Sequence, residues 1–261
     1  MNANALLQQF SEQQVAGFML VLARIAPLFA IAPLFSSKMI PARVRGLAAV
    51  GLAVGMAPMA LEGSHVPLDV MSLALIAGKE LLVGLAFSYS IAALFAAVSA
   101  AGSLMDTLIG FSFGALVDPI TGSSAAVLSQ AYSLVGVAVF IAINGDAWVI
   151  QGLHHTYDLV PLTGTPALGS MVAGVQHAFA GVLVAAVEIA APVMIAVIVT
   201  DAAFGVVARV VPQLNVFSVG FPAKVTIGLL VLGVSLPFAA GWISDQLQDS
   251  VNAALQSLRV A

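Results

Sequence analysis

Charged residues are scarce in this sequence. Asp, Glu, Lys and Arg make up only 8% of the 261 residues, and 61% are hydrophobic. Soluble domains carry about 25% charged residues, so the composition excludes an ordinary soluble protein. Uncharged stretches, each long enough for the ~20-residue helix that crosses a bilayer, run over 81–105, 119–145, 159–187 and 225–244. The sequence therefore predicts an all-α, membrane-associated protein.

Cysteine is absent, which excludes disulfides, thiolate metal sites and thiol catalysis. The eight Lys and Arg residues form no basic tract, so we expect no nucleic-acid partner. The chain contains no H-E-x-x-H, G-x-S-x-G or Walker-type motif. The adjacent His154 and His155 should point in different directions on a helix, which makes them a poor metal pair. We therefore expect no enzyme activity, no metal and no cofactor.

Six apolar segments are expected in a single domain spanning residues 1–261. They run over 15–35, 46–61, 71–105, 125–143, 171–211 and 225–243. Ser11 and Gln14 fit a capping box at the start of the first segment. The runs 71–105 and 171–211 exceed one membrane span, which predicts a bent helix or a tight hairpin for each. The segment between 144 and 170 is expected to be a loop.

The tail, residues 244–261, has apolar side chains at helical spacing. Leu247, Val251, Leu255 and Leu258 would lie on one face of a helix. The sequence therefore predicts an amphipathic C-terminal helix.

Four of the charges inside or beside the apolar runs are candidates for subunit contacts. Lys79 and Glu80 are adjacent, so on a helix they point about 100° apart and should not simply neutralise each other. Each is expected either to pair with another chain or segment, or to lie near an interface and snorkel. Glu188 and Asp201 share one long run, and one or the other should meet a basic residue elsewhere in a complex; a water-filled cavity would satisfy them equally well.

A glycine-rich loop, residues 105–124, interrupts the apolar pattern and contains "GFSFGALVDPITGSS" at 110–124. Its notable residues are Gly110, Phe111, Phe113, Gly114, Asp118 and Pro119. Asp-Pro favours a type I turn, and glycines let the backbone fold tightly. Phenyl rings at a constriction can exclude water and close a pore. The alternative is an interface loop whose rings merely pack.

The stretch "RVVPQLNVFSVGFPAK", 209–224, places polar residues and prolines between two apolar runs. Its notable residues are Arg209, Pro212, Gln213, Asn215, Phe217, Pro222 and Lys224. Pro212 and Pro222 should end one helix and start another, leaving a non-helical corner. The amides of Gln213 and Asn215 need partners there. Arg209 and Lys224 would mark the cytoplasmic rim.

Three stretches resemble the FliR/SctT family of type III secretion export-gate subunits. They are "PQLNVFSVGFPAK" at 212–224, "GFSFGALVDPITGSSAAVL" at 110–128 and "PLFSSKMIPARVRGLAA" at 33–49. The resemblance extends over nearly the whole chain, and the first stretch is closer to flagellar members. After Asn144 and Gly145 the family commonly has His, whereas this chain has Asp146.

The resemblance implies a core subunit of a helical, hetero-oligomeric export gate in the bacterial inner membrane and flagellar basal body. One copy would assemble with FliP-like and FliQ-like membrane subunits, much of it above the membrane plane. A FlhB-like switch protein would wrap the cytoplasmic entrance. The 105–124 loop would plug the channel through which unfolded flagellar proteins pass, and the charges of the apolar runs would serve subunit contacts.

Two alternatives stay open on the sequence. The chain could be the injectisome counterpart of the same gate. It could also be a secondary transporter of small solutes, since such proteins combine broken helices with acidic residues at a central site. A transporter of that kind predicts an internal repeat, and none is visible in the sequence.

Overall fold

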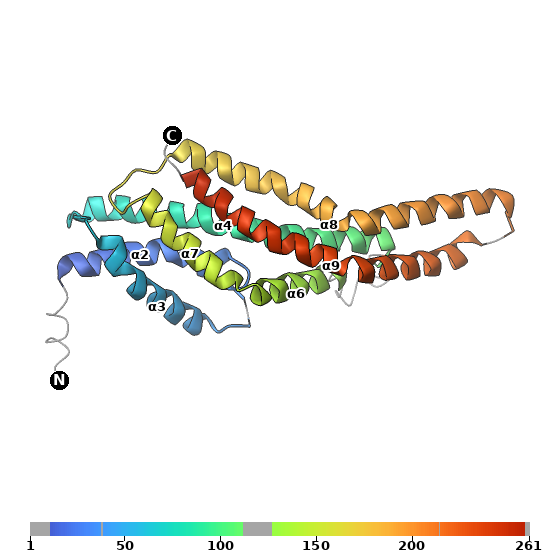
Figure 1. Cartoon of the computed structure of the whole chain (residues 1–261), viewed down its shortest axis with the longest axis horizontal. Coiled ribbons are helices and arrows are strands. Elements are labelled where there is room, and N and C mark those ends of the chain that lie inside the picture. Colours follow the sequence, from blue (N-terminus) through green and yellow to red (C-terminus); the bar gives the residue numbers. More distant parts are fainter. Residues whose placement is uncertain (1–10, 38, 112–126, 214, 259–261) are drawn as a thin grey trace. The chain divides into compact units, whose positions relative to one another are not determined.

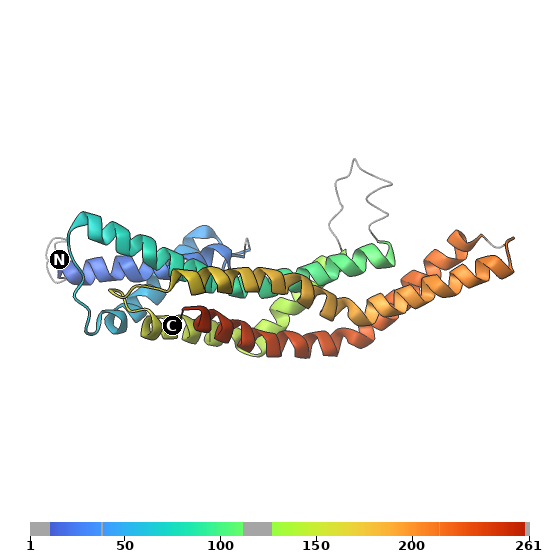
Figure 2. The same ribbon diagram turned by 90° about the horizontal axis from the view of Figure 1, so that it is seen from above.

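The computed structural model describes residues 11–37, 39–111, 127–213 and 215–258, and every regular element in them is a helix (Figures 1 and 2). The helices are α2 (Glu12–Ile31), α3 (Ala42–Leu61), α4 (Val70–Ile109), α6 (Val127–Ala142), α7 (Gly145–Leu159), α8 (Leu168–Val210) and α9 (Val216–Leu258). Five of these helices are long and apolar enough to cross a membrane. The pair α6 and α7, which a short break separates, is a sixth candidate if the two helices form one span. The all-α prediction is confirmed.

Helices α2 and α4 begin at polar caps. The Ser11 hydroxyl accepts from the Gln14 N–H at 3.2 Å, and the Gln14 side chain accepts from the Ser11 N–H at 3.0 Å, which completes the expected capping box. The Asp69 carboxylate accepts from the Ser72 N–H at 2.9 Å where α4 begins. Both caps satisfy amides that the first helical turn leaves without partners.

The two longest apolar runs form continuous helices. Helix α4 has 40 residues and α8 has 43, so of the two alternatives expected for these runs the tight hairpin is wrong. Pro192 lies inside α8 without ending it, because a proline removes only one backbone hydrogen bond from the helix. Helix α9 likewise continues from the corner through the amphipathic tail.

Helix α7 occupies a segment that was expected to be a loop. Its apolar residues Val149, Leu153 and Tyr157 recur at helical spacing and are buried, whereas Asp146 and Asp158 are exposed. Asn144, with φ 54° in the left-handed region, precedes its first residue. The segment is amphipathic rather than uniformly apolar, so an uninterrupted apolar run does not reveal it.

The chain divides into two compact units. Unit 1 comprises Met1–Ala93, Asn144–Ala178 and Leu247–Ala261, and unit 2 comprises Leu94–Ile143 and Phe179–Gln246. Helices α4, α8 and α9 therefore each contribute to both units. In unit 1, α2 packs on α3. A second core of this unit joins α4, the end of α7, α8 and the C-terminal end of α9 through Val83, Ala86, Val160, Met171 and Leu258.

In unit 2, the core is built where α4 and α6 meet α8 and α9. Its buried residues include Met105, Ile109, Tyr132, Val193 and Ile243. Helices α8 and α9 run side by side here as an antiparallel pair, which we call the α8–α9 hairpin, residues 179–246 (Figures 1 and 2).

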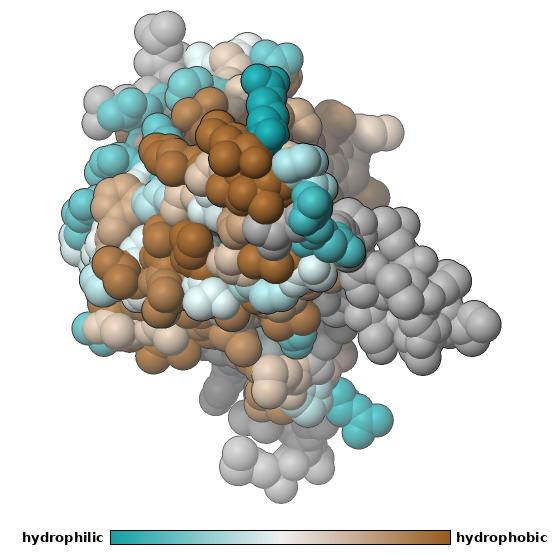
Figure 3. Space-filling model, turned by 90° about the vertical axis from the view of Figure 1, so that its right-hand side faces the viewer, coloured by the Kyte–Doolittle hydropathy of each residue, from teal (hydrophilic) through white to brown (hydrophobic). Residues whose placement is uncertain are grey.

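The α8–α9 hairpin keeps much of its apolar surface uncovered. In an 18-residue apolar stretch of α8 only 28% is buried within the chain, and in that of α9 only 22%. The corresponding share for α4 is 61%. Figure 3, which looks onto the end of this hairpin, shows broad hydrophobic areas with hydrophilic residues between them. Exposed residues here include Ile198, Val206, Val219, Leu230 and Val234. A surface this apolar requires lipid or another protein against it.

Candidate functional site

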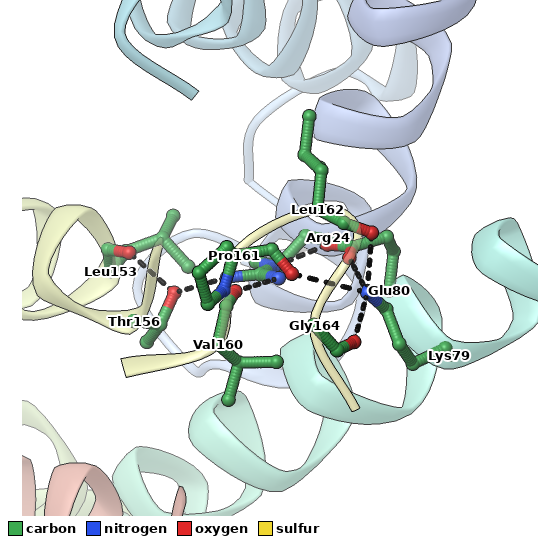
Figure 4. Close-up of polar contacts among 9 residues, drawn as sticks. All are labelled: Arg24, Lys79, Glu80, Leu153, Thr156, Val160, Pro161, Leu162 and Gly164. Atoms are coloured by element: carbon green, nitrogen blue, oxygen red, sulfur yellow. Dashed lines mark hydrogen bonds and ion pairs between the residues drawn. The ribbon is translucent and has the colours of Figure 1, made fainter. Parts of the chain in front are cut away.

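A cluster of charges lies buried in unit 1, centred on Arg24 of α2 (Figure 4). The Arg24 guanidinium donates through Nε to Glu80 of α4, through Nη1 to the Thr156 hydroxyl at 3.2 Å and through Nη2 to the Val160 carbonyl at 2.7 Å. Its central carbon also lies 4.0 Å from the centre of the Tyr157 ring. Arg24 and Glu80 are both 0% exposed. One guanidinium thus joins α2, α4 and the end of α7.

Gly84 allows α2 and α4 to approach closely enough for this contact. A Cβ atom at Gly84 would overlap the backbone carbonyl of Arg24. Gly84 lies one turn after Glu80, on the same face of α4. The absence of a side chain at this position therefore sets the helix contact that brings Arg24 to Glu80.

Lys79 holds the loop that follows α7. Its ammonium donates to the carbonyls of Pro161, Leu162 and Gly164 at 3.2, 2.6 and 2.9 Å (Figure 4). The same nitrogen lies 2.9 Å from the Glu80 carboxylate. The expectation that these adjacent charges would not neutralise each other is wrong, because the long lysine side chain bends back toward its neighbour. Both charges have partners within this chain.

Arg24 itself was missed as a site residue. The signal was present, because a lone basic residue inside an apolar segment needs a buried partner. What the sequence did not supply was the pairing, since 56 residues separate Arg24 from Glu80. Burying such ions is costly unless they are paired, so loss of one partner leaves the others as uncompensated buried charges.

A second buried carboxylate, Asp106, joins the two helices that flank the glycine-rich loop. It lies near the end of α4 and is 1% exposed. Its oxygens accept from the Leu128 N–H at 3.0 and 3.2 Å and from the Ser129 N–H at 3.3 Å, in the first turn of α6. The Ser129 hydroxyl also donates to the Ser99 carbonyl of α4 at 2.9 Å. Asp106 thus acts as an N-terminal cap for α6 from another helix.

The structure describes only residues 105–111 of the plug loop expected at 105–124, and 105–109 belong to α4, so the loop begins later than expected, at Gly110. Gly110 follows α4 with φ 103°, a backbone conformation that favours glycine. Phe111 is 36% exposed. Phe113, Gly114, Asp118 and Pro119 lie outside the described residues.

The corner at 209–224 is shorter than expected. Helix α8 ends at Val210, and Asn215 caps α9 by accepting from the Ser218 N–H at 3.3 Å. Pro222 lies inside α9, so the expectation that it bounds the corner is wrong. A proline there costs one hydrogen bond to an earlier carbonyl, and the helix continues past it.

The other residues of this motif have different surroundings. Arg209, Pro212 and Gln213 are exposed. The Phe217 side chain lies outside what the structure describes.

Two polar pairs cross the α8–α9 hairpin. Lys224 donates to Asp201 at 2.8 Å, and the Trp242 indole N–H donates to Glu188 at 3.2 Å. Both acids were expected to be buried charges, but within this chain alone both are exposed. Their proposed role in subunit contacts stays a prediction.

Comparison with known proteins gives one consistent result. The sequence model of "Bacterial export proteins, family 1" matches residues 15–250. Flagellar biosynthetic protein FliR of Escherichia coli (strain K12) is 28% identical over 250 residues, 95% of each chain. The protein of the same name from Bacillus subtilis (strain 168) is 30% identical over 225 residues, 84% of this chain and 85% of that one. Surface presentation of antigens protein SpaR of Shigella sonnei is 27% identical over 214 residues, 81% of this chain and 82% of that protein.

Proposed function

The chain belongs to family 1 of the bacterial export proteins, and from that premise we propose that it is a membrane-embedded subunit of the flagellar type III export apparatus. The observation that carries the proposal is the match over residues 15–250, which spans the 209–224 corner and the glycine-rich loop together. Relatives named as flagellar proteins match almost end to end, which supports the flagellar assignment. The SpaR relative supports the injectisome counterpart as the second candidate.

The proposed partners are FliP-like and FliQ-like membrane subunits, with one copy of this chain per gate and a FlhB-like protein at the cytoplasmic entrance. The uncovered apolar surface of the α8–α9 hairpin supports this, because so large an apolar face needs a cover. Within the basal body, sister subunits would supply part of that cover in place of lipid. The exposed acids Glu188 and Asp201 would then contact those subunits.

The loop between α4 and α6 would close the channel to ions until an unfolded flagellar protein passes. The contacts of Asp106 support this role, because they bring together the two helix ends from which the loop extends. A plug attached at both ends can be displaced and return without separating from the gate.

Complementation tests the function directly. The gene is expressed in a bacterium that lacks its own FliR, and swimming and export of flagellar proteins are measured. We expect both to be restored, with two small membrane proteins copurifying in excess. Restoration of injectisome secretion alone would favour the SpaR-like role, and purification as a lone chain or a symmetric oligomer would contradict a gate subunit.

Deletion of residues 110–117 tests the plug. With the whole gate expressed, the deletion should make the membrane leak ions and small solutes. A leak unchanged from that of the intact gate would leave Phe111 and Phe113 as packing residues.

A further inference from the structure

We propose that His154, His155 and Asp158 form a binding site for a divalent transition-metal ion of the zinc class on the exposed side of α7. The three residues each offer a ligand atom, and these atoms all lie within 4.8 Å of one another. This proposal is independent of the export function, because it rests only on the geometry of one helical turn.

The geometry corrects the expectation that the two imidazoles diverge. Their ring centroids lie 5.7 Å apart, and the Nδ1 of His155 lies 3.0 Å from a carboxylate oxygen of Asp158. Zinc binds nitrogen and oxygen at about 2.0–2.2 Å, so two ligands of a tetrahedral ion lie about 3.3 Å apart. His154 and Asp158 are separated by four positions and therefore share one face of the helix. Metal binding therefore requires side-chain rotations that bring the donors together from separations of up to 4.8 Å.

The donor set and its exposure select the kind of ion. Two imidazoles and one carboxylate suit zinc and its neighbours, whereas calcium and magnesium prefer oxygen ligands. The side chains of His155 and Asp158 are 50% and 59% exposed, so an ion reaches them from water. Three protein ligands leave a fourth position for water or for a side chain of a neighbouring subunit.

Ion binding at this turn would act on the buried charge cluster. Thr156 and Tyr157 lie between the ligands in sequence and face inward, where both contact Arg24. A metal bridging 154, 155 and 158 would hold the last turn of α7 in its helical conformation. That turn would then keep its contacts with Arg24 more persistently, so the ion should stabilise the folded chain.

The test is zinc binding by the purified membrane complex, prepared without a histidine tag. Bound metal is counted by elemental analysis after titration with Zn²⁺, for the wild type and for His154→Gln/His155→Gln. The wild type should hold one more ion per copy of this chain than the variant. The matched control is His65→Gln/His177→Gln, which replaces the other two histidines of the chain and should bind like the wild type.

Two further readouts separate binding from misfolding. Co²⁺ should give a visible absorption band of a four-coordinate site in the wild type, and Asp158→Asn should weaken Zn²⁺ binding at least tenfold while the complex keeps its size on gel filtration. Zn²⁺ should raise the Tm of the wild type and not that of the double variant. Equal zinc uptake and equal Tm shifts in the wild type and the double variant would overturn the proposal.

Discussion

The buried charge cluster of unit 1 and the polar pairs of the α8–α9 hairpin use the same chemistry in opposite surroundings. Arg24 and Glu80 are fully buried, Lys79 is partly buried beside them, and all three have partners within this chain. Asp201 and Glu188 form contacts across the hairpin but remain exposed beside a broad apolar surface. The difference indicates that the first set of charges stabilises the subunit itself, whereas the second is available to other molecules.

The largest expected effect comes from breaking the enclosed pair. Glu80→Ala leaves the buried Arg24 and the Lys79 ammonium without their counter-ion, which should cost about 3–5 kcal/mol of folding free energy. The amount of folded chain recovered from membranes, and its thermal unfolding, measure the loss. Glu188→Ala is the matched control and should leave both unchanged. Replacing Arg24 and Glu80 together by Met and Leu should recover much of the stability, and failure of that double variant would contradict a purely structural role.

The next effect tests the helix contact beneath that pair. Gly84→Ala places a methyl group against the Arg24 carbonyl and should destabilise the chain by about 1–3 kcal/mol. Gly78→Ala, in the same helix, meets nothing within 4 Å and should stabilise it by up to about 1 kcal/mol, because alanine favours helix. Thermal unfolding of the two purified variants should therefore shift in opposite directions. Equal shifts would mean that Gly84 does not set the contact.

Asp106 gives an intermediate case, since it is buried but lies beside the glycine-rich loop. Asp106→Ala leaves two amides of the first turn of α6 without their acceptor, which should cost about 1–3 kcal/mol. We also expect ion leak through the assembled gate, measured as loss of membrane potential. Asp106→Asn retains an acceptor oxygen and should leak less than the alanine variant. If neither variant leaks ions, the Asp106 contacts are not needed to keep the channel closed.

A smaller effect on stability, with a larger one on assembly, is expected in the hairpin. Lys224→Met removes an exposed ion pair worth about 0–1 kcal/mol, and Asn215→Leu removes a helix cap worth about 1 kcal/mol. Both should lower the yield of intact complex more than they lower the Tm of the chain. If the complex of either variant keeps its stoichiometry and heat stability, the replaced residue does not contribute to contacts with partner subunits.

The smallest effect belongs to Asp69, which is fully exposed. The hydrogen bond from the Ser72 N–H lowers the pKa of this carboxyl below its ordinary value. Its contribution to stability is therefore present at neutral pH and is lost as the pH falls through the lowered pKa. Asp69→Asn should show a lower Tm than the wild type at neutral pH, and the gap should close in acid. A gap that is constant with pH would show that the ionised form contributes nothing.

Much of the fold was predictable because apolar runs report buried or lipid-facing helices directly. The segments expected at 71–105 and 171–211 became α4 and α8, and the Ser11 capping box is present as expected. The hairpin alternative failed because long hydrophobic runs look alike whether the helix inside them turns back or continues. Helix α7 was not predicted because polar side chains on one of its faces break up the apolar run.

The site was less predictable, because its contacts join residues far apart in the chain. The scarcity of charge singled out Lys79 and Glu80, yet their partners Arg24 and the carbonyls of 161–164 became visible only in three dimensions. Asp106 is likewise an acid at the end of an apolar run. Its role as an acceptor was not predictable, because it accepts from backbone amides, which every residue except proline has. The expectation for Pro222 failed because the loss of one backbone hydrogen bond at a proline does not by itself end a helix.

The attachment of Lys79 has a consequence for how this protein can diverge. Its ammonium is recognised by main-chain oxygens of Pro161, Leu162 and Gly164, and a main-chain oxygen is present whatever the side chain. This contact therefore constrains the path of the backbone at those positions and not the identity of their side chains, although packing constrains the buried Leu162. Analyses that infer contacts from correlated mutations would therefore overlook one of the firmest attachments in the molecule.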